Sequence, residues 1–397
     1  MKLSAYHKSI GDSVTLKTDY DDLDQYDHVY ISKVFTDTEI PGEPKDKSQK
    51  TSENITEWYR DNAFLKRGNI TYGGTGFFYD KAPPLPNHIE HIMPDYHLYD
   101  DWVEKCVSGG GKRKEFTYYL DYSIGYLTRK CFRGCCYCVN RNAKKCVKAS
   151  PLSEFMDESR PKLCFLDDNF FANPDWKQLI QPVICSGKRF QFKQGLDERL
   201  LTIEKVNEIT KWKYDGDLIF AFDNIEDKDL IESKLRMFRD VAPHYTRRLK
   251  FYVFCGFDKD NIYDDVFWQK DIHDLFERIE ILARYDALPY VMRYERVYKS
   301  EYSSFYASVA AWCNQPSLFR SFPFRTFCQC WSIAKQDYKQ FGRDMKSYLA
   351  SGGKKGKAWR EMDLVEKLFP EIANEYYDLC GGLNRRVNET IENPRRY

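Results

Sequence analysis

The sequence has no long apolar run and almost no net charge, and each absence excludes a class of function. No stretch of its 397 residues approaches the apolar length that a membrane span requires, so we expect no action at a membrane. No run of small and apolar residues with a cleavage site opens the chain, which predicts a cytoplasmic protein. The formal net charge is +1, so overall charge does not favour nucleic acid or an anionic membrane as a partner.

A disulfide framework is also missing, although the chain has thirteen cysteines. Their number is odd and their spacing is irregular, which in a reducing compartment predicts metal binding together with buried thiols. Hydrophobic residues make up 42% of the chain, enough for a substantial core, and the length allows two or three domains.

One short stretch concentrates the chemistry. Residues 126–142 read YLTRKCFRGCCYCVNRN and place Cys131, Cys135 and Cys138 in a CxxxCxxC spacing. A closed structural zinc site needs four protein ligands, so three thiolates predict an iron–sulfur cluster with one iron left open. The alternative is a zinc site completed by Cys136 or Cys146. Using Cys136 in place of Cys135 would leave one residue before the last cysteine, which is a poorer geometry for capping separate irons.

Strand-like and helix-like segments alternate after this point. The strand candidates are Tyr118–Thr128, Pro161–Leu166, Phe190–Gly195, Asp217–Phe222, Phe251–Phe257 and Leu288–Tyr294. The helix candidates between them are Ser153–Ser159, Trp176–Cys185, Ile203–Trp212, Asp227–Val241 and Asp271–Tyr285. This alternation predicts a parallel sheet, either doubly wound or curved into part of a barrel.

The flanking regions differ from this pattern. Before residue 100 we predict a small α/β unit with strands at Met1–Tyr6, His28–Phe35 and Ile70–Phe78 and a helix at Ile55–Phe64. After residue 300 the sequence predicts aromatic-rich helices at Tyr302–Trp312, Phe327–Phe341 and Trp359–Phe369.

Polar residues fall where the predicted strands end, which is where parallel sheets bind ligands. Asp167, Asp168 and Asn169 follow the second strand, Gln194 lies inside the end of the third, and Asp223 follows the fourth. Gly256 lies near the end of the fifth strand. We expect several of these residues to contact a polar ligand, with Asp168 and Gln194 foremost.

With these features the chain resembles the radical S-adenosylmethionine (SAM) superfamily, whose signature is the CxxxCxxC loop with an aromatic residue before its last cysteine. The resemblance covers residues 118–295. The stretches FLDDNFF at 165, QGLDERLL at 194, FAFD at 220, YVFCGFD at 252 and PYVMRYE at 289 resemble the branch whose members often carry an N-terminal cobalamin-binding domain.

The resemblance implies that the three cysteines hold a [4Fe-4S] cluster whose open iron chelates SAM, and that reductive cleavage of SAM gives a 5'-deoxyadenosyl radical. It also implies SAM contacts: Tyr137 at adenine, Asp168 and Asn169 at the amino group, Asp223 at the ribose, Gly256 beside the nucleoside, and the backbone around Met292 at adenine. Asp167, Asp168 and Asn169 replace the superfamily's usual GGE turn.

The implied architecture has three parts: a shortened cobalamin-binding-like, flavodoxin-like α/β domain at 1–100, a partial parallel (β/α)6 barrel core at 118–298, and a helical region at 299–397. Cobalamin itself is not expected, because the DxHxxG motif is missing and His7 in AYHKSIG lacks the aspartate and glycine at the right spacing. The substrate and the outcome of the reaction cannot be read from the sequence.

Partners and further clusters stay open alternatives. Seven basic residues crowd the cysteine loop: Arg129, Lys130, Arg133, Arg141, Lys144, Lys145 and Lys148. They fit a solvated face, a docking face for an acidic flavodoxin or ferredoxin-type electron donor, or a nucleic-acid groove, although no RNA-binding module is present. Cys313, Cys328, Cys330 and Cys380 could hold a second cluster, but buried thiols are the more common case. A non-catalytic zinc- or cluster-binding protein that retains the fold is the alternative to an enzyme.

Overall fold

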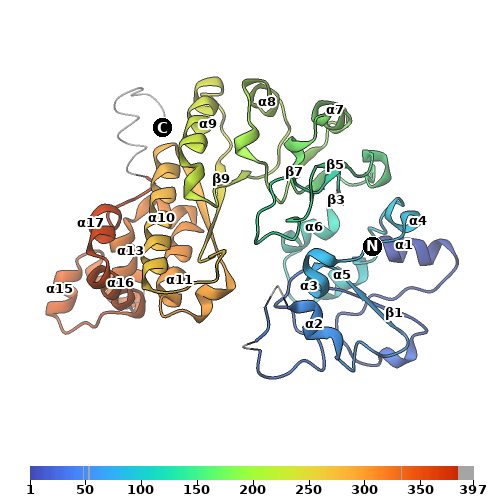
Figure 1. The fold of residues 1–397 in the computed structure, drawn as a ribbon, viewed down its shortest axis with the longest axis horizontal. Helices are drawn as coiled ribbons and strands as arrows, with labels where there is room; N and C mark the ends of the chain where they lie inside the picture. The colour runs from blue at the N-terminus through green and yellow to red at the C-terminus, as the bar shows by residue number, and fades with distance from the viewer. Residues whose placement is uncertain (48, 52–53, 332, 383–397) are drawn as a thin grey trace. The chain divides into compact units, whose positions relative to one another are not determined.

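The computed structural model describes residues 1–47, 49–51, 54–331 and 333–382, and it divides into two compact units, Met1–Gln194 and Gly195–Tyr397 (Figure 1). Each unit contains helices together with parallel strands, so the predicted α/β class is confirmed.

The first unit contains two parallel sheets. β1 (Val29–Ser32) pairs with β2 (Ile70–Gly73), and β6 (Lys162–Phe165) lies between β3 (Tyr122–Gly125) and β7 (Arg189–Phe192). The helices of this unit are α1 (Lys2–Ser9), α2 (Ile55–Arg60), α3 (Thr75–Phe78), α4 (Asn87–Glu90), α5 (Asp100–Ser108), α6 (Thr117–Leu120) and α7 (Trp176–Cys185). α2 lies between β1 and β2 in the chain and falls within the predicted helix Ile55–Phe64.

A short antiparallel ribbon interrupts the first unit. β4 (Thr128–Arg129) pairs with β5 (Val147–Lys148), and the amide of Ala149 continues the ladder to the carbonyl of Leu127 at 2.9 Å. The ribbon closes residues 130–146 into a loop, and this loop carries the CxxxCxxC cysteines.

The second unit contains one parallel sheet with β9 (Leu249–Cys255) between β8 (Leu218–Ala221) and β10 (Ala287–Arg293). Its helices are α8 (Ile203–Ile209), α9 (Lys228–Val241), α10 (Asp265–Arg284), α11 (Ser303–Cys313), α12 (Pro316–Ser321), α13 (Phe324–Trp331), α14 (Lys335–Phe341), α15 (Met345–Ala350), α16 (Lys357–Leu368) and α17 (Pro370–Tyr376). The predicted helical character of the C-terminal region is therefore confirmed within the described residues.

Local sequence explains the elements of the second unit. Ile231, Leu235 and Phe238 recur every three or four residues along α9 and are buried, which is the periodicity of one helix face. Asp264 caps α10, since its side chain accepts a hydrogen bond from the amide of Phe267 at 2.9 Å. Buried and partly exposed residues alternate along all of β9, so the sheet has one covered face and one more open face.

Several predicted elements are wrong in detail. The predicted strand Met1–Tyr6 is instead helical from Lys2, where α1 begins, since Lys, Leu and Ala also favour a helix. Tyr118–Thr128 divides into α6, β3 and β4. Ser153–Ser159 is not a helix, because only the 3₁₀ turn Leu152–Glu154 forms there and Phe155 then packs on the end of β3. Phe327–Phe341 is not one continuous helix, since α13 ends at Trp331 and α14 begins at Lys335.

The strand order bears on the two predicted sheet types. In both three-stranded sheets each strand neighbours the next one in the alternating series, with no reversal of order inside either sheet. A doubly wound sheet has a reversal at its switch point, whereas a barrel has neighbours in sequence order. The described strands form separate sheets and do not close into a barrel.

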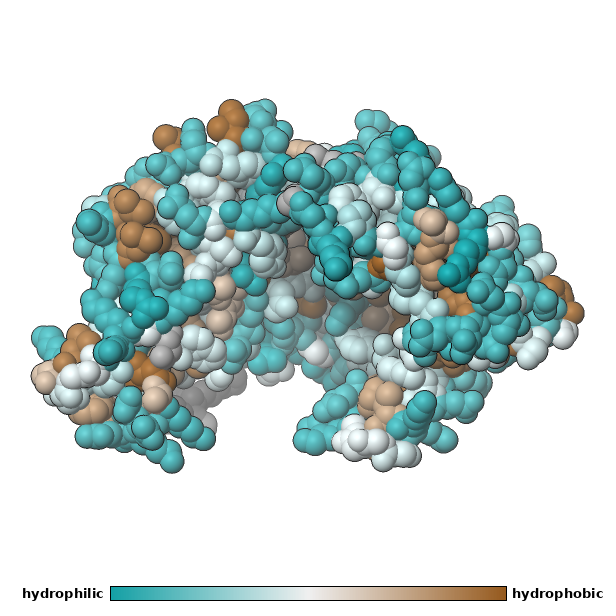
Figure 2. Space-filling model, turned by 90° about the horizontal axis from the view of Figure 1, so that it is seen from below, coloured by the Kyte–Doolittle hydropathy of each residue, from teal (hydrophilic) through white to brown (hydrophobic). Residues whose placement is uncertain are grey.

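One face of the molecule is mainly polar. In the view of Figure 2 hydrophilic residues cover most of the face, and hydrophobic residues form separate patches. None of the helices in the described ranges has both the length and the apolar character that crossing a membrane requires.

Candidate functional site

The cysteine loop is anchored at its base by Asp167, which is fully buried just after β6. Its carboxylate accepts hydrogen bonds from the amide of Leu127 at 3.1 Å, the amide of Thr128 at 2.7 Å and the hydroxyl of Thr128 at 2.7 Å. Burial raises the pKa of Asp167 to about 7. The three hydrogen bonds oppose this shift, because they stabilise the carboxylate form. The sequence placed Asp167 at a strand end but gave no sign of this anchoring contact.

Asp168 and Asn169, the predicted ligand-binding residues, both contact the loop. The amide of Lys130, which has a left-handed φ of 72°, donates to Oδ2 of Asp168 at 2.6 Å. The side-chain Nδ2 of Asn169 donates to Sγ of Cys131 at 3.3 Å. Asp168 is half-buried whereas Asn169 is buried, so Asp168 has the more accessible of the two side chains.

The other two predicted cysteines belong to one tight turn. The amide of Cys138 donates to the carbonyl of Cys135 at 2.9 Å, and the amide of Asn140 donates to Sγ of Cys138 at 3.4 Å. Burial raises the pKa of Cys138, and the nearby Cys135, Asp168 and Cys131 add to the shift. Because the thiolate is the form that binds metals, this thiol would release its proton on binding a metal ion.

Residues 79 and 80 hold the far side of the loop. The hydroxyl of Tyr79 donates to the carbonyl of Tyr137 at 2.5 Å. Nε of Arg141 donates to Asp80 at 2.8 Å, and Nδ2 of Asn142 donates to the same carboxylate at 2.9 Å. The backbone of Tyr137, the predicted adenine contact, is thus fixed by the N-terminal part of the unit.

The chemistry of the donor set fits an iron–sulfur cluster, since three thiols lie in one loop and thiolates are the ligands that such clusters take. The three thiols are half-buried, and two of their sulfurs accept N–H hydrogen bonds, which tune cluster potentials.

The remaining predicted SAM contacts, apart from Gln194, belong to the second unit and lie close together there. Oδ1 of Asp223 accepts from the amide of Phe254 at 3.2 Å, and Phe254 pairs in register with Met292 on β10. Gly256 follows β9 with a φ of 76°, and an added Cβ would lie 2.0 Å from Cγ2 of Val297. Asp223 is half-buried and Met292 is exposed, so ligands can reach both.

A polar network that the sequence did not reveal supports this second set. Both carboxylate oxygens of Asp271 accept from the amide of Gly256 at 3.0 Å, and the buried Tyr306 donates to the same carboxylate. Burial raises the pKa of Asp271. Nη1 of Arg278 donates to three carbonyls, those of Phe222 at 3.0 Å, Asp223 at 2.8 Å and Phe254 at 2.8 Å. The guanidinium of Arg278, on α10, therefore connects the segments that follow β8 with the end of β9. No local sequence motif predicts this contact.

Gln194, the last residue of the first unit, is exposed two residues beyond the end of β7. The C-terminal cysteines contact separate partners. The thiol of Cys380 donates to the carbonyl of Arg320 at 3.4 Å and that of Cys330 to Gly342 at 4.0 Å, while Cys313 and Cys328 are buried. These contacts favour structural thiols over a second cluster.

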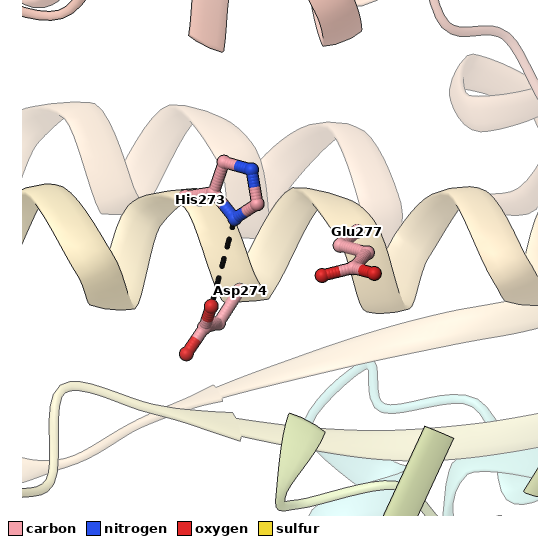
Figure 3. Close-up of side chains that lie close together, drawn as sticks. All are labelled: His273, Asp274 and Glu277. Atoms are coloured by element: carbon pink, nitrogen blue, oxygen red, sulfur yellow. Dashed lines mark ion pairs between the residues drawn. The ribbon is translucent and has the colours of Figure 1, made fainter. Parts of the chain in front are cut away.

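A further group lies on α10, where ligand atoms of His273, Asp274 and Glu277 approach within 4.8 Å of one another (Figure 3). Both carboxylates already carry ammonium partners. Lys270 pairs with Asp274, and Nζ of Lys228 lies 2.7 Å from Glu277. A cation would have to displace both lysines, so this group is best explained as a paired surface cluster.

Comparisons with models of protein families, with curated proteins and with solved structures give no match to this chain.

Proposed function

We propose that this protein is a radical SAM enzyme. The observation that carries the proposal is the CxxxCxxC loop itself: a ribbon closes it, Asp167 anchors it, and Asp168 and Asn169 contact it from the end of the neighbouring strand. Cys131, Cys135 and Cys138 would hold the [4Fe-4S] cluster. When bound, that cluster supplies the electron that cleaves the sulfonium of SAM.

The chain's own residues would bind and orient the cosubstrate. Asp168 offers a carboxylate for the SAM amino group, because its single backbone partner leaves lone pairs available. Within the second unit, Asp223 lies just after β8, where the resemblance implies a contact with the ribose. Gly256 leaves space at the end of β9, and the backbone at Met292 offers hydrogen-bonding groups to adenine. The finer fold, a partial (β/α)6 barrel, is part of this proposal and is supported by the sequential strand order in each unit.

Anaerobic reconstitution with iron and sulfide tests the proposal. We expect a brown protein with about four irons per chain that converts SAM to 5'-deoxyadenosine when reduced with dithionite. Alanine variants of Cys131, Cys135 and Cys138 should each lose the cluster and the activity. Cys136→Ala is the matched control, because Cys136 is exposed in the same loop and should be dispensable. A colourless protein that binds zinc and leaves SAM intact would establish the non-catalytic alternative.

An acidic flavodoxin or ferredoxin-type donor remains part of the proposal as the source of the electron. The N-terminal α/β unit is proposed as a shortened relative of a cobalamin-binding domain without the corrinoid, and a corrinoid absorption spectrum in the purified protein would refute that.

A further inference from the structure

A groove of about 610 Å³ lies beside the cysteine loop in the first unit. One side consists of the end of the loop and β5, and the other consists of the segment that precedes α7. Its lining is formed by Phe132, Lys144, Lys145, Cys146, Val147, Lys148, Ala172, Asn173, Pro174 and Asp175. One lining residue, Phe132, is the sequence neighbour of Cys131 in the proposed cluster site.

The charge of the groove is positive and only partly neutralised. Of the seven basic residues around the loop, Arg129 pairs with Glu90 at 2.9 Å, Arg141 with Asp80 at 2.8 Å and Lys148 with Asp175 at 2.8 Å. Lys144 and Lys145 are exposed and have no carboxylate partner among the residues that the structure describes. The solvated-face interpretation thus explains some of the cations but leaves these two lysines free to bind an anion.

The groove also presents an aromatic ring. Phe132 is 42% exposed, although it lies in a loop that is otherwise held by many hydrogen bonds. The guanidinium of Arg133 lies 4.8 Å from the centre of the Phe132 ring. An exposed ring next to cations is what proteins use to stack an unpaired base while neutralising its phosphates.

We propose that this groove binds a single-stranded nucleic acid, with Lys144 and Lys145 on phosphates and Phe132 stacked on a base. A duplex fits less well, because its bases are already stacked and cannot cover the ring. An acidic protein would satisfy the lysines but would not need the ring. The final step, that the bound strand is the substrate of the radical, rests on the function proposed above.

Fluorescence anisotropy with labelled twelve-nucleotide single strands of RNA and DNA tests the binding. Each lysine–phosphate contact on a single strand contributes a slope of about −0.7 in log K against log salt. Lys144→Gln with Lys145→Gln should therefore reduce the slope by about 1.4 and weaken binding about 25-fold at 0.1 M salt. Lys354→Gln with Lys357→Gln removes the same charge from exposed lysines of the second unit and should change neither value.

The ring is tested separately. Phe132→Leu keeps an apolar side chain without the stacking surface and should weaken binding about 5- to 100-fold without changing the salt slope. Iron content is measured in parallel, because Phe132 adjoins Cys131.

Three results would overturn the inference: no binding of either strand below about 100 µM at 0.1 M salt, equal loss in the Lys354 and Lys357 control, or equal affinity for a duplex of the same length. If single strands do not bind, binding of an acidic flavodoxin that Lys144→Gln with Lys145→Gln weakens would overturn the inference and assign the groove to the electron donor. Because binding is measured without SAM, a protein that binds the strand and cleaves no SAM would refute the proposed function but keep the groove.

Discussion

Removing the Asp167 carboxylate should release the base of the cysteine loop. Asp167→Ala leaves the amides of Leu127 and Thr128 and the Thr128 hydroxyl without their partner, and all three lie in a region with at most 2% exposure. Each buried donor left unsatisfied costs about 1–3 kcal/mol, so we expect the three donors together to give a loss of about 3–9 kcal/mol. This is a large part of the stability of an ordinary domain, which is about 5–15 kcal/mol.

Urea unfolding followed by circular dichroism measures this loss, and iron per chain after reconstitution measures its effect on the loop. Thr128→Val is a graded control, because it removes the hydroxyl hydrogen bond to Asp167 and keeps the hydrogen bond from the backbone amide. It should cost about 1–2 kcal/mol. If Asp167→Ala lost less than 1 kcal/mol and still took up about four irons, Asp167 would not be the anchor of the loop.

Three further perturbations address other parts of the chain. Arg278→Met removes the guanidinium that donates to three strand-end carbonyls and should cost about 3–9 kcal/mol in urea unfolding. A loss below about 1 kcal/mol would contradict the tie between β8 and β9. Gly256→Ala should cost about 2–4 kcal/mol, because the added methyl group would clash with Val297 and because alanine is strained at a left-handed φ. Adding Val297→Ala should recover the part of the loss that comes from the clash, and no recovery would show that the clash contributes nothing. The pKa of Lys33, which is 2% exposed, is lowered by burial to about 8, so the penalty for its charge is complete below pH 8 and disappears as the pH rises toward 10.5. Wild type should gain about 1–3 kcal/mol of stability over Lys33→Met between pH 7.5 and 10, and parallel pH profiles of the two proteins would refute this.

The elements predicted well are those whose side chains carry a strong local pattern. The range of α7 is the predicted Trp176–Cys185, and β6 to β10 fall within a few residues of the predicted aromatic and β-branched runs. The prediction failed where a short segment fits two patterns. Residues 1–6 alternate as a strand does but also contain good helix formers, and neighbouring packing decides such cases.

The candidate site follows the same division. The cysteines are close in sequence, so their grouping in one loop was predictable from spacing alone. The contact between Asn169 and Cys131 was predictable only in part. The convergence of strand ends in a parallel sheet predicts that the two residues lie near each other, but not that they form a hydrogen bond. Asp271 and Arg278 were not predictable as supports, because each side chain reaches backbone groups 15 to 56 residues away from within an ordinary amphipathic helix.

The described contacts also separate support from ligand binding among neighbouring acidic residues. Asp167 is fully buried, and its oxygens are occupied by three donors, so it has little capacity left for a ligand. Asp168, one residue later, is half-buried and accepts a single described hydrogen bond from the backbone. In the second unit Asp271 is similarly occupied by Gly256 and Tyr306, while Asp223 is half-buried at a strand end. Asp168 and Asp223 also accept backbone hydrogen bonds, from Lys130 and Phe254, and in the first unit Asp168 is the more accessible of the two acids.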